Sequence, residues 1–290
     1  MSNEGSNEGY SVADGLLTIR SYVVRELLER IAGQFARWAH EVSAELMVSP
    51  PLLEVGKLKQ IDYFLNFPHL AGPVTTIDTT GLGQGGCELA GDAVPAAQLL
   101  PARLVVPSSA CHGLYFDLEG TTLPGPRTIF TYCACHRNET AYEGLRRLRI
   151  FTMYEIVCFG PAEVVKAFLT GQRALTLDFA KRLGIDVQVE IGTDPFFDPN
   201  GAKASSARSM PTKEEFVAPD GTAIASMNYH RNFFGDRCSI SNADGTFAYS
   251  GCAAWGLERW LHALLAVHDR QPEAALAALE RATGPGAPGA

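Results

Sequence analysis

The chain has 290 residues, of which 46% are hydrophobic and 19% are charged, and its formal net charge is −8. This composition supports a sizeable folded core and excludes an intrinsically disordered protein. The acidic balance argues against a dedicated nucleic-acid surface, and the absence of an 18-residue apolar run excludes a transmembrane helix.

Both ends of the chain predict disorder. Residues 1–15 contain a repeated "SNEG", and residues 276–290 end in the tail "ATGPGAPGA", which cannot pack. No Ser/Pro/Gly-rich linker interrupts residues 16–275, which we therefore expect to form one catalytic-size domain. The first residues also lack the basic and apolar regions of a signal peptide, and seven cysteines without pairing patterns favour reduced thiols. A cytoplasmic protein is expected.

A long amphipathic helix is predicted from about Ile19 to Ala44. After it, the Pro50-Pro51 pair forbids a helix and indicates an edge strand or a bend. The helix prediction depends on apolar residues that recur every three or four positions: Leu27, Ile31, Phe35, Trp38 and Val42.

The middle of the chain alternates in the manner of β-strands. "ARLVVPSSACHGLYFDLEG" is strand-like, and "RTIFTYCACHRNET" with "RLRIFTMYEIVCFG" predicts an antiparallel hairpin around a basic loop. Ala162 to Gly184 is predicted to be helical, and "VQVEIGTDPFF", "EEFVA" and "CSISNAD" to be strands. The expected fold class is α+β, an antiparallel sheet flanked by helices. Neither GxGxxG nor GxxxxGK[ST] occurs, so the usual phosphate-binding loops are absent.

The stretch "GCAAWGLERWLHALL" carries two residues that its apolar helical stripe does not need, Cys252 and Arg259. An arginine here is either solvated or meets an anion, because burying it unpaired is costly. Free cysteines usually behave as small buried hydrophobes, and that interpretation is favoured for most of the others: Cys87, Cys133, Cys158 and Cys238.

Several phrases together resemble the class II aminoacyl-tRNA synthetases. "RNET" followed by "RRLRIFTMYE" is similar to their motif 2, and "AAWGLERW" to motif 3, while the helix from Ile19 and its Pro50-Pro51 strand fit motif 1, the dimer-forming element. "DYFLNFPHLAG", "DPFF" and "SMNYHRNFFG" are similar to archaeal-type seryl-tRNA synthetases and closer still to their truncated relatives, the amino acid:[carrier protein] ligases. The resemblance covers about residues 20–270.

Fewer than 20 residues precede motif 1 and the chain is acidic, so a tRNA would meet neither an arm nor a basic patch. The resemblance to the ligases therefore implies ATP-dependent activation of a small amino acid and its transfer to the phosphopantetheine thiol of a carrier protein. It also implies Zn²⁺ and Mg²⁺ as cofactors, and a homodimer. Two alternatives stay open: a synthetase-like amide ligase acting on a small amine or peptide, and a catalytically inactive binding paralogue.

The same resemblance assigns residues to ATP and the amino acid. Arg137 would contact the carboxylate and the α-phosphate, Glu139 the adenine or the amino acid, and Arg147 the γ-phosphate. Phe151 would stack under adenine, and Arg259 would neutralise the outgoing phosphates. A solvated hairpin tip is the alternative interpretation of Arg146, Arg147 and Arg149.

A zinc site is also implied by the resemblance. Its ligands would be Cys111, Glu155 and Cys252, with the fourth position left for the α-amino group of the substrate. On sequence alone, the two cysteines would be interpreted as inert buried thiols, and their spacing reveals no site. His112 and His230 are expected to be hydrogen-bonded structural histidines.

Three further positions are less constrained. Asn228 is a candidate partner of ATP or Mg²⁺, and Asp220, in a Pro-Asp-Gly turn, is the nearest candidate for an acidic Mg²⁺ ligand. Trp255 is bulky beside the expected pocket, so we expect it to bind substrate and influence the choice of amino acid.

Overall fold

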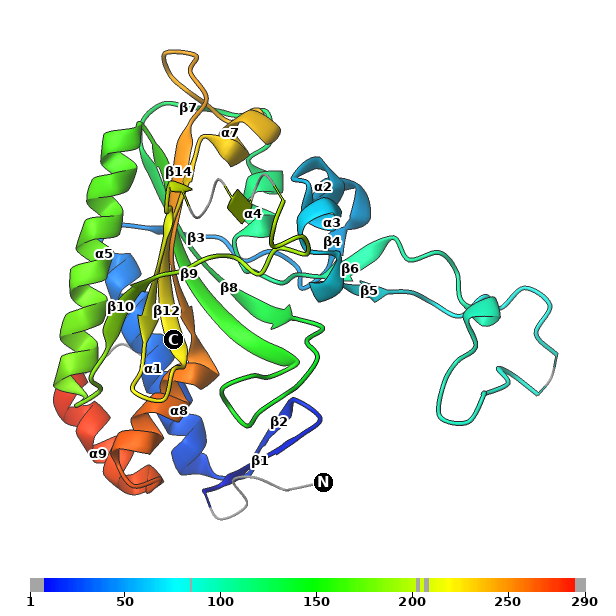
Figure 1. The fold of residues 1–290 in the computed structure, drawn as a ribbon, viewed down its shortest axis with the longest axis horizontal. Coiled ribbons are helices and arrows are strands. Elements are labelled where there is room, and N and C mark those ends of the chain that lie inside the picture. Colours follow the sequence, from blue (N-terminus) through cyan, green and yellow to red (C-terminus); the bar gives the residue numbers. More distant parts are fainter. Residues whose placement is uncertain (1–7, 84, 202–203, 206–208, 285–290) are drawn as a thin grey trace.

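The computed structural model describes residues 8–83, 85–201, 204–205 and 209–284. Within these ranges the main sheet has seven strands, antiparallel except for a parallel pairing at one edge (Figure 1). This arrangement confirms the predicted α+β class. The strands lie in the order β10 (Gln188–Ile191), β11 (Lys213–Val217), β12 (Ala223–Arg231), β14 (Tyr249–Gly256), β9 (Ile150–Gly160), β8 (Arg127–His136) and β3 (Glu45–Leu46).

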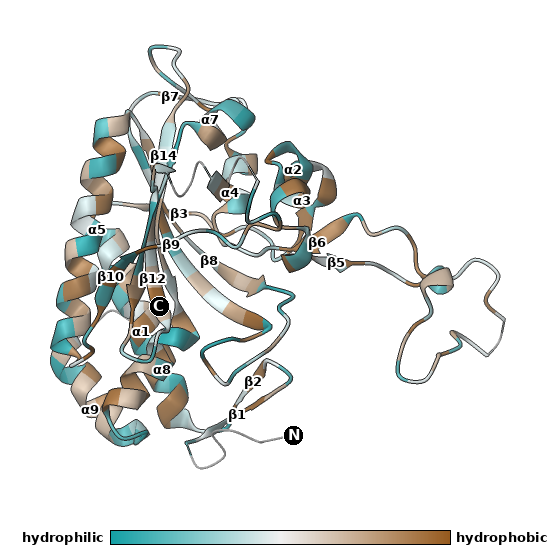
Figure 2. Ribbon diagram, viewed as in Figure 1, coloured by the Kyte–Doolittle hydropathy of each residue, from teal (hydrophilic) through white to brown (hydrophobic). Residues whose placement is uncertain are grey.

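One face of the sheet is covered by α1 (Tyr22–Glu41), α5 (Ala162–Arg182), α8 (Leu257–Val267) and α9 (Pro272–Thr283). The predicted first helix is confirmed, and it begins at Ser21, whose hydroxyl accepts a hydrogen bond from the Val23 backbone N–H at 3.1 Å. Figure 2 shows α5 banded with hydrophobic and hydrophilic residues, as expected for a helix with one face on a sheet. The tryptophans Trp38, Trp255 and Trp260 are fully buried in this layer.

The opposite face carries shorter elements. They are α2 (Val55–Gln60), α3 (Tyr63–Asn66), η1 (Pro68–Leu70), α4 (His112–Asp117) and α7 (Phe233–Arg237). Beside them lie two small sheets, one of β4 (Leu53–Glu54), β6 (Leu104–Val106) and β5 (Gly72–Val74), the other of β7 (Thr122–Leu123) and β13 (Ser241–Asn242). These elements leave part of the sheet open, and the cavities described below lie there.

Residues 75–103 extend away from the body as a two-armed ribbon between β5 and β6, with η2 (Ala96–Gln98) partway along it (Figure 1). Its two arms bond each other near the base, where the Leu100 N–H donates to the Thr76 carbonyl at 3.0 Å. None of its described residues belongs to either of the two apolar core clusters. Leu89 is 64% exposed, so the ribbon adds nothing to the core.

Both predicted disordered ends are partly wrong. Residues 8–15 include β1 (Tyr10–Ala13), which pairs with β2 (Leu16–Ile19), and Tyr10 is buried. Residues 276–283 complete α9, whose Ala278 and Leu279 are buried. Alanine-rich turns and a four-residue strand give weak periodic signals, so the sequence pattern missed both. Residues 1–7 and 285–290 lie outside the described residues.

Two strand predictions also need correction. The second half of "ARLVVPSSACHGLYFDLEG" forms α4, and "CSISNAD" contributes only the two-residue β13 of a small sheet. Before the closing helix, β14 continues to Gly256 and places Cys252 in mid-strand. Among the described residues, no helix combines the length and the apolar character needed to cross a membrane.

Candidate active site

The three predicted metal ligands converge on the open face of the sheet. Cys111 immediately precedes α4, Glu155 lies in β9, and Cys252 lies in β14. Their ligand atoms all lie within 4.8 Å of one another, and each residue is at most 4% exposed. The pairing of β14 with β9 sets Ala254 opposite Glu155, which brings Cys252 beside the carboxylate.

The Glu155 carboxylate is satisfied on one side only. Its Oε1 accepts hydrogen bonds from the Ser109 hydroxyl at 2.8 Å and from the Ala110 and Cys111 backbone N–H groups at 2.8 and 3.1 Å. Its Oε2 is buried, and no hydrogen-bond partner for it exists among the described residues. An orphaned buried carboxylate oxygen is costly, and a cation placed beside it would remove that cost.

The surroundings of the Cys252 thiol also disfavour its ionised form. A hydrogen bond with Cys111, burial and the charge of Glu155 raise the pKa of Cys252 well above its ordinary value. Two buried thiols and a carboxylate cannot all be ionised together without a cation. Sulfur and carboxylate donors in a set of three suit Zn²⁺ and leave a fourth coordination position. The residues therefore fit the implied ion.

A second cavity, lined by arginines, lies along the same face. Arg137, at the end of β8, holds its guanidinium 5.1 Å from the centre of the Phe151 ring and donates to the Ser108 carbonyl at 3.2 and 3.3 Å. Arg259, in α8, donates to the Arg146 and Ala223 carbonyls at 2.9 and 3.0 Å. Burial lowers the pKa of Arg259 to about 10, so it remains charged at neutral pH.

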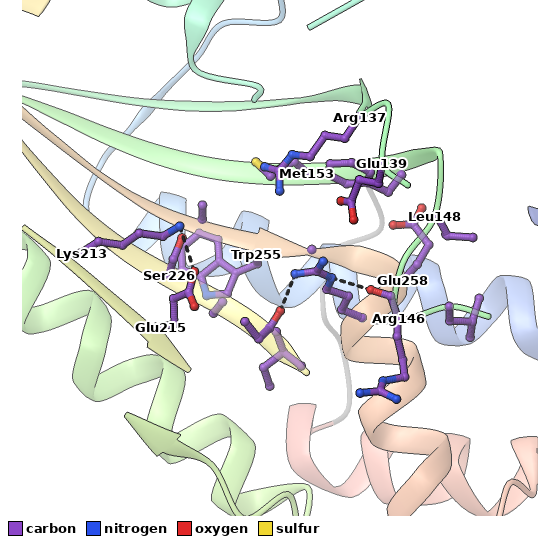
Figure 3. A pocket seen from close by; sticks show the side chains of 18 residues that line it. Arg137, Glu139, Arg146, Leu148, Met153, Lys213, Glu215, Ser226, Trp255 and Glu258 are labelled. Atoms are coloured by element: carbon purple, nitrogen blue, oxygen red, sulfur yellow. Dashed lines mark hydrogen bonds and ion pairs between the residues drawn. The ribbon is translucent and has the colours of Figure 1, made fainter. Parts of the chain in front are cut away.

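Acidic side chains accompany these arginines. Glu139 pairs with Arg147 at 3.0 Å. On the opposite wall, Glu215 pairs with Lys213 at 2.9 Å (Figure 3). Arg147 is half exposed, so it lies at the rim rather than in the wall. The cavity has a volume of about 80 Å³.

The cysteine-lined cavity is larger, at about 460 Å³, and it adjoins the arginine-lined cavity. The two cavities therefore share part of a wall. The residues common to both walls are Arg137, Met153, Lys213, Ser226 and Ala254.

Comparison with known proteins agrees with this geometry. Residues 121–268 match the model of the tRNA synthetase class II core domain (G, H, P, S and T). Amino acid–[acyl-carrier-protein] ligase 2 of Bradyrhizobium diazoefficiens is 31% identical over 269 residues, which cover 87% of this chain and 78% of that protein. The chain belongs to the amino acid:[acyl-carrier-protein] ligase family, within the class II synthetases.

Two other similarities place this ligase among its relatives. Amino acid–[acyl-carrier-protein] ligase 1 of the same organism is 30% identical over 268 residues, covering 88% of this chain and 81% of that protein. A crystal structure of M. kandleri SerRS in complex with A. aeolicus tRNASec has a TM-score of 0.76 at 18% identity, covering 96% of this chain and 58% of that chain. That second likeness shows the class II fold.

Trp255 of this ligase, which we expected to bind substrate, lies mostly in the core. Along β14, Cys252 and Ala254 face the cavities, whereas Ala253 and Trp255 belong to the opposite core cluster. Trp255 borders the arginine-lined cavity, but its indole is fully buried, stacks 5.2 Å from Phe35 and donates to the Thr176 hydroxyl at 3.1 Å. The ring supports the core and does not line the amino acid cavity.

Asn228 and Asp220 also lie differently from expectation. The Asn228 amide donates to Cys252 Sγ at 3.3 Å, which places it beside the cysteines rather than the arginines. Asp220 lines neither cavity; it accepts from His262 at 2.7 Å and lies 3.3 Å from Arg146. Burial raises its pKa, but hydrogen bonds from His262 and Thr222 outweigh this and hold it at about 2. Its position outside both cavities, rather than its pairing, argues against the predicted Mg²⁺ role.

Two contacts that position the site were not predicted from the sequence. One supports the arginine loop, residues 137–149, and the other fixes α8. The Arg149 backbone N–H donates to the Gly15 carbonyl at 2.8 Å, and Tyr142 packs under the Arg149 guanidinium at 4.4 Å, so the β1–β2 turn braces residues 137–149. Both carboxylate oxygens of buried Glu258 accept from the Thr152 N–H, at 2.9 and 3.0 Å, which fixes the start of α8 against β9. No pattern in the sequence signalled either contact.

Proposed function

We propose that this chain activates an amino acid with ATP as the aminoacyl-adenylate and transfers the aminoacyl group to the phosphopantetheine thiol of a carrier protein. One observation carries the proposal. Arg137 lines both cavities. One cavity contains the candidate zinc ligands, which would hold an amine, and the other contains arginines, which would hold phosphates. A planar guanidinium there can contact the amino acid carboxylate and the α-phosphate at the same time.

The first step joins the two substrates. A carboxylate oxygen of the amino acid attacks the α-phosphorus of ATP, the α–β bridging bond breaks, and pyrophosphate leaves. The chain supplies alignment and positive charge, with Arg137 on the attacked phosphate and Arg259 on the leaving phosphates. No proton needs to be removed from the carboxylate, which is ionised at neutral pH.

The amino acid would be held by its nitrogen. Cys111, Glu155 and Cys252 would bind Zn²⁺, which supplies an open coordination position that a neutral amino group can occupy. An acid without an amine would lack this contact, so the site would select amino acids. We propose a small amino acid, in keeping with the similarity of this chain to the ligases.

The nucleotide would enter between Phe151 and the loop of residues 137–149. Because Arg137 covers one face of the Phe151 ring, adenine can stack there only if that guanidinium moves toward the phosphates. The pair Glu139–Arg147 lies at the rim and can separate to meet adenine and the γ-phosphate. Mg²⁺ would accompany ATP, with Glu139 and Glu215 as the accessible carboxylates of this cavity.

The second step releases AMP. The carrier thiol, once deprotonated, attacks the acyl carbon of the adenylate, forms a thioester and displaces AMP. A cavity of about 460 Å³ exceeds the space that a small amino acid needs, which leaves room for the end of a phosphopantetheine arm.

The test has two stages. Amino acid-dependent exchange of pyrophosphate into ATP should occur with the purified chain, and mass spectrometry should then detect an aminoacyl group on a holo-carrier but not on its apo form. Exchange without any holo-carrier loading, together with product formation from a small amine, would instead support an amide ligase. Absence of exchange across the proteinogenic amino acids and small analogues would contradict the proposal.

We also propose a homodimer in a reducing, cytoplasmic compartment. Leu46 of the edge strand β3 is 66% exposed and Val48 beside it is 48% exposed, an apolar edge that a second copy would cover. All seven cysteines are described and all are free thiols, as a reducing compartment favours. Sedimentation at micromolar concentration, with Leu46→Asp expected to give monomers, tests the assembly.

A further inference from the structure

A half-buried histidine contacts the Cys252 thiol. His230 Nε2 lies 3.7 Å from Cys252 Sγ, and the Asn228 amide donates to the same sulfur at 3.3 Å. In the β12–β14 pairing, Tyr229 is opposite Gly251 and Arg231 is opposite Ser250, so His230 is the extra residue of a β-bulge. Bulges of this kind re-aim a side chain beside a site.

The other ring nitrogen of His230 meets hydroxyl groups. Its Nδ1 lies 3.1 Å from the Tyr115 hydroxyl and 3.1 Å from the Ser250 hydroxyl. Both hydroxyl-bearing residues are at most 1% exposed, and Tyr115 is fixed by stacking on Phe234 at 3.7 Å. A neutral imidazole has one N–H and one acceptor nitrogen. If a hydroxyl donates to Nδ1, the ring proton lies on Nε2, which faces the sulfur.

We propose that His230 is a positioning residue: Tyr115 and Ser250 hold it as the Nε2–H tautomer, and it donates a hydrogen bond to the Cys252 thiolate of the zinc centre. The inference rests on the proposed metal site but concerns a residue outside its ligand set, since His230 does not join the cluster of ligand atoms within 4.8 Å.

The arrangement makes the two sulfurs unequal. Cys252 receives N–H groups from both Asn228 and His230, whereas Cys111 Sγ has the Ser109 hydroxyl at 3.3 Å. Hydrogen bonds to a thiolate favour its ionised form and fix its orientation. Cys252 would therefore be held as a thiolate directed at the metal, and loss of these bonds would weaken metal binding.

The hydrogen bonds that link Tyr115, His230 and Cys252 can be removed at two residues without removing a metal ligand. Tyr115→Phe deletes one hydroxyl and keeps the stacked ring, His230→Leu deletes the donor, and His230→Gln keeps an N–H. Tyr132→Phe is the matched control, because it also deletes a phenol hydroxyl but lines neither cavity. All variants are made in a Cys133→Ser background, because Cys133 and Cys135 form a second thiol pair with sulfurs 3.6 Å apart.

The readouts are the zinc dissociation constant, by chelator competition, and the thiolate-to-cobalt charge-transfer band of the Co²⁺ form. Tyr115→Phe and His230→Leu should weaken zinc binding about 10- to 100-fold and shift the band, while His230→Gln and Tyr132→Phe should resemble the parent. The proposal would be overturned if Tyr115→Phe and His230→Leu both kept the zinc affinity and the cobalt spectrum of the parent. It would also be overturned if His230→Gln weakened zinc binding as much as His230→Leu.

Two outcomes separate this inference from the proposed function. If the parent protein binds neither Zn²⁺ nor Co²⁺, the metal site itself is wrong, and the positioning role is overturned with it. If the parent binds Co²⁺ but an activated amino acid leaves the spectrum unchanged and His230→Leu alters ligand number, His230 is a fourth ligand, and the positioning role is overturned.

Discussion

The two cavities on the open face of the sheet differ in which charged group lies without a charged partner. Beside Cys252, the buried Glu155 carboxylate has one oxygen, Oε2, with no hydrogen-bond partner among the described residues. In the other cavity, the buried Arg259 guanidinium donates to the neutral carbonyls of Arg146 and Ala223. These two groups support the proposed ligands, a metal ion in one cavity and phosphates in the other.

Replacing the Cys252 sulfur should have the largest effect on zinc binding and on activity. Cys252→Ser should lose zinc and lower pyrophosphate exchange about a thousandfold, because a catalytic zinc contributes several kcal/mol. Metal analysis and exchange assays measure both effects. Cys133→Ser, which alters a thiol outside both cavities, should retain zinc and exchange. Full exchange by a metal-free Cys252→Ser would contradict the ligand role.

Substitutions of Trp255 test whether the helical layer behind the sheet affects only stability or also the choice of amino acid. Trp255→Ala should lower the free energy of unfolding by about 3–5 kcal/mol, because a buried indole and its packing are lost. Denaturant unfolding measures this loss. Trp255→Phe, which keeps a ring in the core, should leave the amino acid profile of the enzyme unchanged, and a shifted profile would return Trp255 to the substrate pocket.

On the arginine side, Arg259→Ala should lower exchange by about 10²- to 10³-fold, or about 2.7–4 kcal/mol, the usual loss of one charge-stabilising donor. Zinc content should not change, which distinguishes this variant from Cys252→Ser. Arg173→Ala removes an exposed arginine paired with Glu214 and serves as the control. Wild-type exchange in Arg259→Ala would exclude its role on the phosphates.

The smallest of the predicted effects concerns the β1–β2 turn, which supports the loop of residues 137–149. Gly15 has φ +74°, and a Cβ there would lie 2.7 Å from the Tyr142 ring. Gly15→Ala should therefore cost about 1–3 kcal/mol of stability and raise the KM for ATP roughly tenfold, with zinc affinity unchanged. Gly81→Ala has a similar φ of +81° in open space and controls for backbone strain. Equal KM values in the two variants would show that the turn does not brace the loop.

Much of the frame could be predicted from the sequence. The β8–β9 hairpin follows from two alternating β-branched and aromatic runs, and α1 follows from its apolar stripe. The metal ligands could not be found by spacing, because Cys111, Glu155 and Cys252 meet only through strand pairing and the start of α4. The similarity to known synthetases supplied what local patterns lacked.

The remaining errors share a physical cause. Trp255 lies differently from expectation because residues three apart in a strand face opposite sides, so closeness to Cys252 along the chain did not place its ring in the cysteine-lined cavity. The contact of His230 with Tyr115 depends on a bulge and on residues 115 positions apart, which no local pattern encodes. Residue type predicted the chemistry of the site, and topology decided which atoms meet.

The ribbon of residues 75–103 has a practical consequence. Val74 and Leu104 are paired in register at its base, so a short hairpin turn could rejoin the strands if the ribbon were excised. Lengthening it would be inexpensive as well, because each doubling of a flexible loop costs only about 0.6 kcal/mol. The ribbon is thus a place where domains, tags or fluorescent labels can be inserted while catalysis proceeds undisturbed elsewhere.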